Sequence, residues 1–311
     1  MQTNIVEELQ RTVEGAEADR ILRSCVHCGF CNATCPTFQL LGDELDGPRG
    51  RIYLMKQVLE GAEPSRATQI HLDRCLTCRN CETTCPSGVE YGKLLDIGRH
   101  QVEEQVTRPW HERAMRAALR RILPHPGRFR ALLRMGQLAR PVLPGLLKKR
   151  VPPWQREPRR PELRHERRML MLEGCVQPAM SPGINASAAR VLDRLGISLV
   201  PAPEAGCCGA IDQHLGAPEA ARDRMRANID AWWPHVEAGA EALVMTASGC
   251  GALVREYGYH LADDPEYADK ARRISAMTRD LSEIVAGEDL ASLRPDRPLR
   301  VAVQVPCTLQ H

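Results

Sequence analysis

Two cysteine runs of identical spacing constrain this sequence more than any other feature. Each run places three cysteines three residues apart, adds a fourth after four residues and ends in a proline, at Pro36 and at Pro86. The second run follows the first by fifty residues, so the pattern is an internal repeat. The eight positions are Cys25, Cys28, Cys31, Cys35, Cys75, Cys78, Cys81 and Cys85. Thiolates at this spacing are typical ligands of a metal centre.

The spacing predicts two [4Fe–4S] clusters with ligands exchanged between the runs. In this pattern the three close cysteines of a run hold one cluster, while the fourth, before the proline, binds the other cluster. The predicted ligands are Cys25, Cys28, Cys31 and Cys85 for the first cluster, and Cys75, Cys78, Cys81 and Cys35 for the second. Structural zinc sites are the alternative, but they use pairs of cysteines and leave the third close cysteine unexplained.

A short segment between the runs, Asp46–Arg51, carries a helix-start signal. It has an acidic residue at the cap position and Pro48 just inside the expected helix. Its two arginines, Arg49 and Arg51, are expected either to serve this helix alone or to lie near an anionic cluster or a partner.

The number of cysteines and the first twenty residues indicate the cellular compartment of the protein. The chain has thirteen cysteines among 311 residues, an odd number that disulfide pairing cannot use up. The first twenty residues lack an apolar stretch and carry five acidic side chains, which argues against a secretory signal. We therefore expect a reducing cytoplasm, in which cysteines serve as metal ligands. No stretch approaches the roughly 20 apolar residues of a transmembrane helix, so any membrane contact is expected to be peripheral, at the inner membrane.

Composition divides the chain into zones. Residues 1–107 hold the eight cysteines between segments of helical periodicity and are expected to form a small helical domain. Residues 108–167 are a connector rich in arginine and proline, with two short helices and an extended strap expected. Eighteen Lys or Arg and four Asp or Glu lie between Arg108 and Arg168, although the whole chain has a net charge of only +3. Few aromatic residues interleave with these charges, which disfavours nucleic-acid binding.

Strand and helix patterns alternate in residues 168–298. Apolar segments at 168–174, 197–201 and 241–247 are predicted strands, and helical patterns at 184–196 and 218–236 separate them. This alternation predicts a parallel sheet with helices packed on it.

Four cysteines of this zone fall where predicted strands end or helices begin. They are Cys175, the pair Cys207 and Cys208 followed by Gly209, and Cys250. Because loops at the carboxyl ends of parallel strands meet at one edge of the sheet, the four thiols can converge there. We predict a metal site, either a further iron–sulfur cluster or a zinc ion. The alternative is inert buried cysteine around a tight Cys-Cys-Gly turn.

The last residues repeat the start of this zone. The segment 302–310 is similar to 170–178, so a strand is expected to run into Cys307 as one runs into Cys175. Residues 299–311 are therefore expected to begin a second module of the same kind, truncated after its first cysteine.

These motifs together resemble the glycolate oxidase (glycolate dehydrogenase) iron–sulfur subunit family, within a wider group that joins a two-cluster ferredoxin domain to cysteine-rich CCG domains. The resemblance rests on residues 25–61, 75–99 and 306–311. It implies an α+β multidomain fold, with a helical bacterial-type two-[4Fe–4S] ferredoxin domain followed by an α/β cysteine-rich CCG domain. Leu253 stands where some CCG modules carry a further cysteine.

The resemblance also implies a place in an oxidoreductase complex that acts on CH–OH donors. In that family, partner subunits that carry flavin oxidise glycolate to glyoxylate, and the iron–sulfur subunit passes electrons to a quinone-type acceptor at the membrane. Catalysis at carbon would lie on the partners, so no catalytic residue is expected in this chain. Related complexes acting on glycerol-3-phosphate, lactate or a heterodisulfide are the alternative. A zinc-structured protein that binds nucleic acid or a membrane is a further alternative of a different class.

Overall fold

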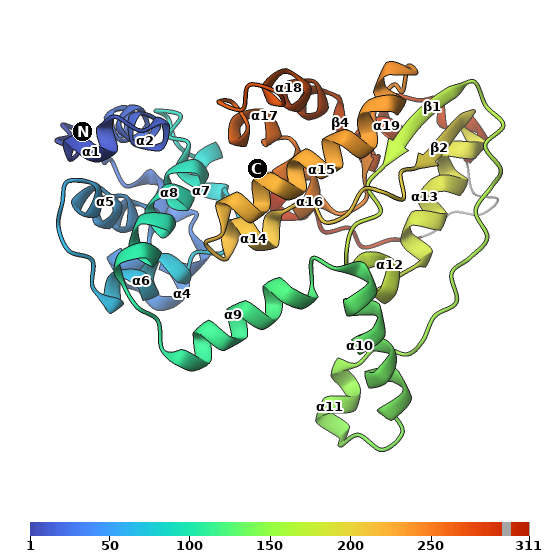
Figure 1. Ribbon diagram of the computed structural model, residues 1–311, viewed down its shortest axis with the longest axis horizontal. Coiled ribbons are helices and arrows are strands. Elements are labelled where there is room, and N and C mark those ends of the chain that lie inside the picture. Colours follow the sequence, from blue (N-terminus) through green and yellow to red (C-terminus); the bar gives the residue numbers. More distant parts are fainter. Residues whose placement is uncertain (294–299, 311) are drawn as a thin grey trace. The chain divides into compact units, whose positions relative to one another are not determined.

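The computed structural model describes residues 1–293 and 300–310, and contacts divide the chain into two compact units (Figure 1). Unit 1 contains Met1–Ala114 together with the described residues from Gln304 onward, and unit 2 contains the described residues of Met115–Val303. The division falls inside a helix of the connector, so the connector contributes to both units. No helix in the described part of the chain is both long and apolar enough to cross a membrane.

Unit 1 is helical. Its elements are α1 (Glu7–Gln10), α2 (Val13–Ser24), α3 (Phe30–Ala33), α4 (Pro36–Leu41), the 3-10 turn η1 (Glu44–Asp46), α5 (Pro48–Leu59), α6 (Arg66–Asp73), α7 (Asn80–Thr83), α8 (Tyr91–Gln105) and the first part of α9 (Trp110–Ile122). Local signals start several of them: Thr12 caps α2, Pro48 occupies the first turn of α5, and Ser65 forms a capping box with Thr68 at α6. The cysteine runs themselves contain only the four-residue helices α3 and α7.

The core of unit 1 lies where α5 and α8 pack together. Met55 on α5 and Leu94 and Leu95 on α8 are fully buried. Gly98 allows the two helices to approach closely, since a Cβ at this position would lie only 2.5 Å from the Met55 Sδ. The same buried cluster contains Cys25 and Cys81, with Cys31, Cys75 and Cys85 packed against it. The cysteine runs are therefore part of the core of this unit.

Unit 2 is an α/β unit built on a four-stranded sheet. The strands are β1 (Arg167–Met171), β2 (Ile197–Pro201), β3 (Leu243–Met245) and β4 (Thr278–Asp280), all parallel to their neighbours, in the order β2-β1-β3-β4. After the rest of α9, the helical elements are α10 (Pro126–Ala139), α11 (Gly145–Arg150), α12 (Gln177–Met180), α13 (Gly183–Arg194), α14 (Ala210–His214), α15 (Pro218–Glu237), α16 (Ser248–Val254), α17 (Tyr257–His260), α18 (Ala268–Met277), α19 (Leu281–Ala286) and the 3-10 turn η2 (Leu290–Leu293). The strand order reverses between β1 and β3.

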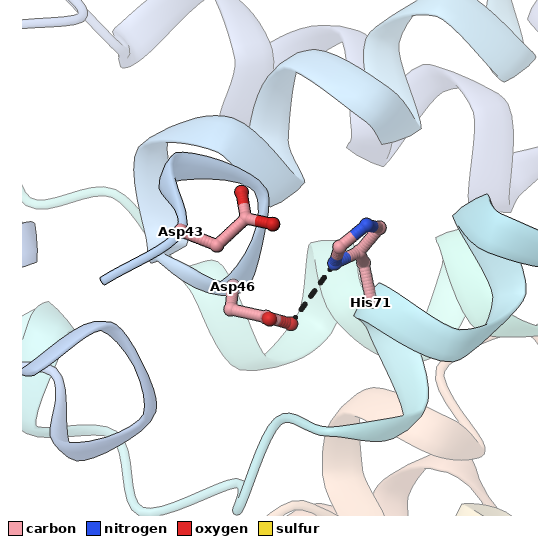
Figure 2. Close-up of side chains that lie close together, drawn as sticks. All are labelled: Asp43, Asp46 and His71. Carbon is pink, nitrogen blue, oxygen red and sulfur yellow. Dashed lines mark hydrogen bonds and ion pairs between the residues drawn. The ribbon is translucent and has the colours of Figure 1, made fainter. Parts of the chain in front are cut away.

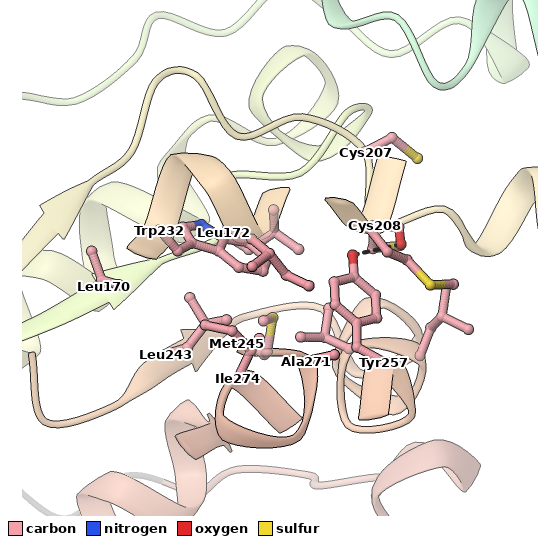
Figure 3. Close-up of a cluster of buried hydrophobic side chains, with 14 of the residues drawn as sticks. Leu170, Leu172, Cys207, Cys208, Trp232, Leu243, Met245, Tyr257, Ala271 and Ile274 are labelled. Atoms are coloured by element: carbon pink, nitrogen blue, oxygen red, sulfur yellow. Dashed lines mark hydrogen bonds between the residues drawn. The ribbon is translucent and has the colours of Figure 1, made fainter. Parts of the chain in front are cut away.

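Side chains of β1 alternate between two hydrophobic cores, one on each face of the sheet. Leu170 packs into the core with side chains of α15 and α18, among them the fully buried Trp232 (Figure 3). Met169 and Met171 belong to the other core, with side chains of α13 and α19. Because helices cover both faces, residues 169–171 of β1 and all of β3 are continuous buried apolar runs.

The extended strap, residues 151–166, ends against α13 and β2. Arg164 Nη2 and His165 Nε2 lie 2.8 Å and 2.9 Å from the carboxylate of Asp193 on α13. The backbone N–H of His165 donates to the Ser198 Oγ at 2.9 Å. The strap therefore has specific contacts with the sheet unit at the point where it enters β1.

The predicted fold class is confirmed, because a helical unit with the cysteine runs precedes an α/β unit with a parallel sheet. The three predicted strands are present as β1, β2 and β3, and the two predicted helices as α13 and α15. The sequence did not predict β4, which has only three residues.

Two expectations differ from the structure. The connector contains three helices, since α11 begins directly after Pro144, and a proline is tolerated where a helix starts. No strand leads into Cys307: residues 300–306 have no regular structure and α20 (Cys307–Gln310) follows them. A strand forms by pairing its backbone groups with a neighbour, and these residues pair with none of the described strands. The boundary expected between residues 298 and 299 lies outside the described residues.

Candidate metal centres

The four cysteines predicted to hold the first cluster surround one cavity in unit 1, the first cavity. It has a volume of about 430 Å³, counted with its opening, and its lining includes Cys25, Cys28, Cys31 and Cys85. Cys25 is buried and Cys28 is exposed, so one side of the cavity faces solvent. The structure thus brings together three cysteines of the first run and the last cysteine of the second run.

The other predicted set surrounds a second cavity, of about 300 Å³, whose lining includes Cys35, Cys75, Cys78 and Cys81. Cys81 also lines the first cavity, and the two cavities share Pro48, Cys81 and Tyr91. The fourth cysteine of each run lies at the cavity of the other run, as the exchange of ligands requires. Ligation by these two sets stays a prediction.

The fifty-residue repeat extends to the backbone. His27 and Thr77 have φ values of 58° and 55°, and Gly29 and Arg79 have φ values of 85° and 60°. Left-handed residues at matching places between the cysteines turn both runs around their cavities in the same way. A non-glycine residue held there costs on the order of 1 kcal/mol, so the surrounding packing has to enforce the conformation.

The two runs differ in the side chain at one of these matching places. A Cβ at Gly29 would lie 2.8 Å from Nη1 of Arg49, so glycine leaves room for this arginine at the first cavity. In the second run the residue at this place, Arg79, itself lines the second cavity. Similar backbones therefore present different side chains to the two cavities.

Polar side chains beside the thiols fit an anionic iron–sulfur cluster. The buried hydroxyl of Tyr91, which lines both cavities, makes no hydrogen bond of ordinary geometry with the described residues. Nη2 of the buried Arg51, at the second cavity, also makes no hydrogen bond. Both groups are donors, and cluster sulfur accepts hydrogen bonds. Burial and the neighbouring Cys25 raise the pKa of Cys31 to about 11, so metal binding would have to displace its proton.

Asp43, Asp46 and His71 lie close together near these cavities (Figure 2). Two carboxylates and an imidazole suit a cation, but the fully buried Asp46 already accepts from His71 Nδ1 at 3.0 Å and Arg74 Nη1 at 2.8 Å. Arg51 Nη2 lies 3.6 Å from the same carboxylate. Burial raises the pKa of Asp46, but the hydrogen bonds from His71 and Arg74 outweigh burial and leave it below its ordinary value. The carboxylate is therefore occupied as a counter-ion for arginine.

The four cysteines of the CCG pattern also come together, at the carboxyl edge of the sheet in unit 2. Cys175 follows β1, Cys207 and Cys208 precede α14, and Cys250 lies in α16. The Cys175 and Cys208 thiols donate to Cys207, and Cys208 also interacts with Cys250. These hydrogen bonds lower the pKa of Cys207 and Cys250 and, with burial, raise the pKa of the two donors. The four thiols thus interact in sequence, from Cys175 through Cys207 and Cys208 to Cys250, and four thiols are a ligand set for zinc or for an iron–sulfur cluster.

Hydrogen bonds from distant residues fix the Cys-Cys-Gly turn. Asn228 Nδ2 donates to the Cys207 carbonyl at 2.9 Å, and the Tyr257 hydroxyl donates to the Cys208 carbonyl at 2.8 Å (Figure 3). Gly209 has a φ of 98°, and a Cβ there would lie 3.2 Å from a backbone oxygen of α15. Glycine therefore suits both the left-handed backbone and the close approach of the helix.

A cavity of about 790 Å³, counted with its opening, lies beside these thiols. Its lining includes residues that follow β1 and β3, the strands between which the order reverses. Ligands of open parallel sheets usually bind at such a point. Cys175 and Cys250 line this cavity together with Gln177 and Thr246. A metal centre held by the four cysteines would face it.

Several of these residues escaped sequence reasoning. Tyr91, Asn228 and Tyr257 are single polar residues in helices, and no local pattern distinguishes them from other such residues. The segment Asp46–Arg51 did carry a signal, because it combines two arginines with a helix start between the cysteine runs. Cys307 is exposed and lines neither cavity of unit 1.

Two family models match the chain. One, described as a 4Fe-4S dicluster domain, matches residues 21–89 and spans both cysteine runs. The other, described as a cysteine-rich domain, matches residues 169–255 and spans the four CCG cysteines. The dicluster match favours iron–sulfur clusters over zinc in unit 1.

Curated relatives extend the similarity to the whole chain. The glycolate oxidase iron-sulfur subunit of Escherichia coli (strain K12) is 60% identical over 312 residues, which cover 100% of this chain and 77% of that protein. The probable glycolate oxidase iron-sulfur subunit of Bacillus subtilis (strain 168) is 32% identical, covering 93% of this chain and 71% of that protein. No solved structure matches. The paired cavities, both domain models and the full-length similarity agree: the chain belongs to the glycolate oxidase iron–sulfur subunit family and serves in iron–sulfur electron transfer.

Proposed function

We propose that this chain carries electrons for a glycolate-oxidising complex through two [4Fe–4S] clusters. The ligand sets are Cys25, Cys28, Cys31 and Cys85 for the first cluster and Cys75, Cys78, Cys81 and Cys35 for the second. The observation that carries the proposal is the pair of adjoining cavities, each lined by one complete set of four thiols. When bound, a [4Fe–4S] cluster accepts and releases single electrons.

The residues around the cavities hold the clusters and limit their contact with water. Thiolates of the eight cysteines bind iron, and their protons leave when metal binds. Cys25, Cys81 and Tyr91 are buried, so most of the wall between the cavities is closed to solvent. Cys28 is exposed, which makes the first cavity the side open to a redox partner.

The donor and the acceptor follow from the family. Two relatives are named as iron–sulfur subunits of glycolate oxidase, which supports flavin-bearing partner subunits that oxidise glycolate to glyoxylate. This chain would receive their electrons and deliver them to a quinone-type acceptor. We assign no catalytic residue to it, because catalysis at carbon would lie on the flavin-bearing partners.

A second part of the proposal concerns unit 2. The thiols of Cys175, Cys207, Cys208 and Cys250 would hold a further metal centre, an iron–sulfur cluster or a zinc ion. Their mutual hydrogen bonds and the turn fixed by Asn228 support this site. Iron and zinc analysis of the purified chain separates the two metals.

The last part of the proposal is a peripheral contact with an anionic membrane, made by α10 and α11. Leu138, Val142 and Leu146 are more than four-fifths exposed, and Lys148–Arg150 follow them directly. Exposed apolar residues beside a basic cluster are the composition that attracts acidic lipid headgroups. Leu138→Glu should abolish co-sedimentation with vesicles rich in phosphatidylglycerol, while binding unchanged by this substitution would reject the contact.

The decisive experiment is anaerobic co-purification with the partner subunits. We expect brown protein with about eight irons per chain from unit 1, and a reduced [4Fe–4S] signal in electron paramagnetic resonance (EPR) after glycolate is added. Lactate and glycerol-3-phosphate serve as comparison donors. Zinc in place of iron would reject the electron-transfer role, and reduction by lactate but not glycolate would reject the donor.

A further inference from the structure

Helix α5 brings one arginine to each cluster cavity. Arg49 lines the first cavity and Arg51 lines the second. Both come from the first turn of the helix, directly after Pro48, whose ring fixes where the helix begins. One short segment thus supplies a positive charge to both proposed clusters.

The two arginines differ in burial and in pairing. Arg49 is 38% exposed, and its Nε donates to the Glu44 carboxylate at 2.6 Å, so its charge is neutralised at the surface. The Arg51 side chain is 0% exposed. Its Nε donates to the His71 carbonyl at 2.7 Å, and its Nη1 donates to the Thr37 hydroxyl at 3.1 Å. A charge in the protein interior acts more strongly on its surroundings than one screened by water.

Arg51 reaches a proposed ligand through one residue. The Thr37 hydroxyl that accepts from Arg51 lies 3.2 Å from the Sγ of Cys35, and it donates to the Asp46 carbonyl at 2.8 Å. Nη2 of Arg51 makes no hydrogen bond. This nitrogen lies 3.6 Å from the Asp46 carboxylate, so the guanidinium is held beside the second cavity by an ion pair that is longer than a hydrogen bond.

Tyr91 adds a neutral donor at the same place. Its fully buried hydroxyl makes no hydrogen bond of ordinary geometry with the described residues, and Cys75 lies beside it. Cys75 belongs to the second cavity, and Tyr91 lies at the N-terminus of α8, a long helix of the core. The hydroxyl is held where a sulfur of the second cluster can accept from it.

The charges around the second cavity are positive in sum. Arg51 and Arg74 share the single carboxylate of Asp46, which leaves one guanidinium charge uncompensated. Arg79 also lines this cavity, with the Glu82 carboxylate beside it near Gly92. At the first cavity, by contrast, Arg49 and its carboxylate partner cancel.

We propose that Arg51 and Tyr91 make the cluster at the second cavity the more easily reduced of the two, so that an electron entering the chain comes to rest there. Reduction adds one negative charge to a cluster, and a buried positive charge and hydrogen-bond donors stabilise the reduced state and raise its potential. The inference rests on the two ligand sets proposed above.

The first experiment assigns the potentials. The full chain, loaded with both clusters anaerobically, is titrated with reductant and followed by EPR. Cys35→Ser and Cys85→Ser each change one ligand of one cluster, so the signal that shifts or disappears identifies that cluster. We expect two separate midpoint potentials in the unaltered chain, the higher one belonging to the cluster altered by Cys35→Ser. The reverse order would overturn the inference.

The second experiment tests the two residues. Tyr91→Phe removes only a hydroxyl, and we expect the higher potential to fall and one exchangeable-proton coupling of that cluster to vanish from its ENDOR spectrum. Arg51→Met should lower the same potential, and Arg51→Lys, which keeps the charge, should largely restore it. Tyr53→Phe, an exposed tyrosine, is the matched control and should leave both potentials unchanged.

The outcomes separate this inference from the proposed function. A chain that binds no iron rejects the proposed function. A chain with both clusters intact, whose potentials do not respond to Tyr91→Phe or Arg51→Met, rejects the inference alone. If Arg51→Met loses iron, Tyr91→Phe decides the matter, since it leaves the ion pairs of Asp46 in place.

Discussion

Both units bury cysteines in a hydrophobic core, but they surround these cysteines with different amounts of regular secondary structure. In unit 1, Cys25 and Cys81 belong to the buried cluster, and the two cysteine runs contain only the four-residue helices α3 and α7. In unit 2, Cys175, Cys207 and Cys208 also belong to a buried cluster, but they lie at the carboxyl edge of a four-stranded sheet whose other face carries a separate core. Metal binding should therefore be part of folding in unit 1, whereas unit 2 should fold around its sheet first and bind metal afterwards.

The largest expected effect comes from removing Cys81, a proposed ligand of the second cluster whose side chain lines both cavities. Cys81→Ala should lose iron from both proposed clusters. The free energy of unfolding of unit 1 should fall by several kcal/mol, because the free energy of metal binding no longer contributes to folding. Hydrogen exchange read by mass spectrometry should show residues 21–89 losing protection while β1, β2 and β3 keep theirs. Cys307→Ala, at an exposed cysteine, is the control. Equal loss of protection in the strands would break the comparison.

The reverse experiment weakens only the sheet unit. Trp232 is fully buried on α15, so Trp232→Ala should cost about 3–5 kcal/mol. Trp110, which is 79% exposed, provides the control Trp110→Ala with little effect. Urea unfolding followed by pulse proteolysis measures the loss in unit 2, and iron analysis should show both clusters retained. Iron lost together with the sheet would mean that the two units fold as one.

A smaller effect tests whether the Cys-Cys-Gly turn depends on its glycine. Gly209→Ala has to hold a left-handed backbone, at about 1 kcal/mol, and also has to place a methyl group against α15, at about 1–2 kcal/mol more. Gly196→Ala has the same backbone demand with φ 78° but open space around the methyl group. Thermal unfolding should therefore give a lower Tm for Gly209→Ala than for Gly196→Ala. Equal losses would show that the close approach of the helix is not limiting.

The smallest expected effect concerns the strap. Burial raises the pKa of Asp193, but hydrogen bonds from Arg164 and His165 outweigh it and leave the pKa below its ordinary value of about 3.8. The contact therefore stabilises the fold above that value and is lost as the pH falls through the lowered pKa. Asp193→Asn should cost about 0.5 kcal/mol at pH 7, because Arg164 is mostly exposed and screened. Urea titrations at pH 7 and pH 3 should show this difference shrinking at the lower pH.

Repeating patterns were the part of this molecule that its sequence could predict. Cysteine spacing predicted two sets of four thiols, and the strands β1 to β3 followed from apolar runs between helical segments. Both signals are local, because they depend on neighbouring residues in one stretch of chain.

The residues that sequence reasoning missed act over long distances in the chain. Asn228 and Tyr257 lie twenty or more residues from the turn that they fix, and the hydrogen bonds exist only once α15 and α17 are packed. The expected strand before Cys307 is absent because similarity to a strand elsewhere does not supply a pairing partner. Local sequence patterns were thus sufficient to predict the candidate cysteine ligands. They were insufficient to predict the residues whose hydrogen bonds hold those cysteines in place.

The matched left-handed residues of the two runs have a consequence for how such a protein changes over generations. His27 and Thr77, like Gly29 and Arg79, give the two repeated segments one backbone conformation with different side chains. A duplicated scaffold can keep its architecture while single replacements at the lining diverge. Two repeated cluster sites can in this way come to differ in potential, so that one donates electrons and the other accepts them. A direction of electron transfer can then arise from a repeat whose two sites were once equivalent.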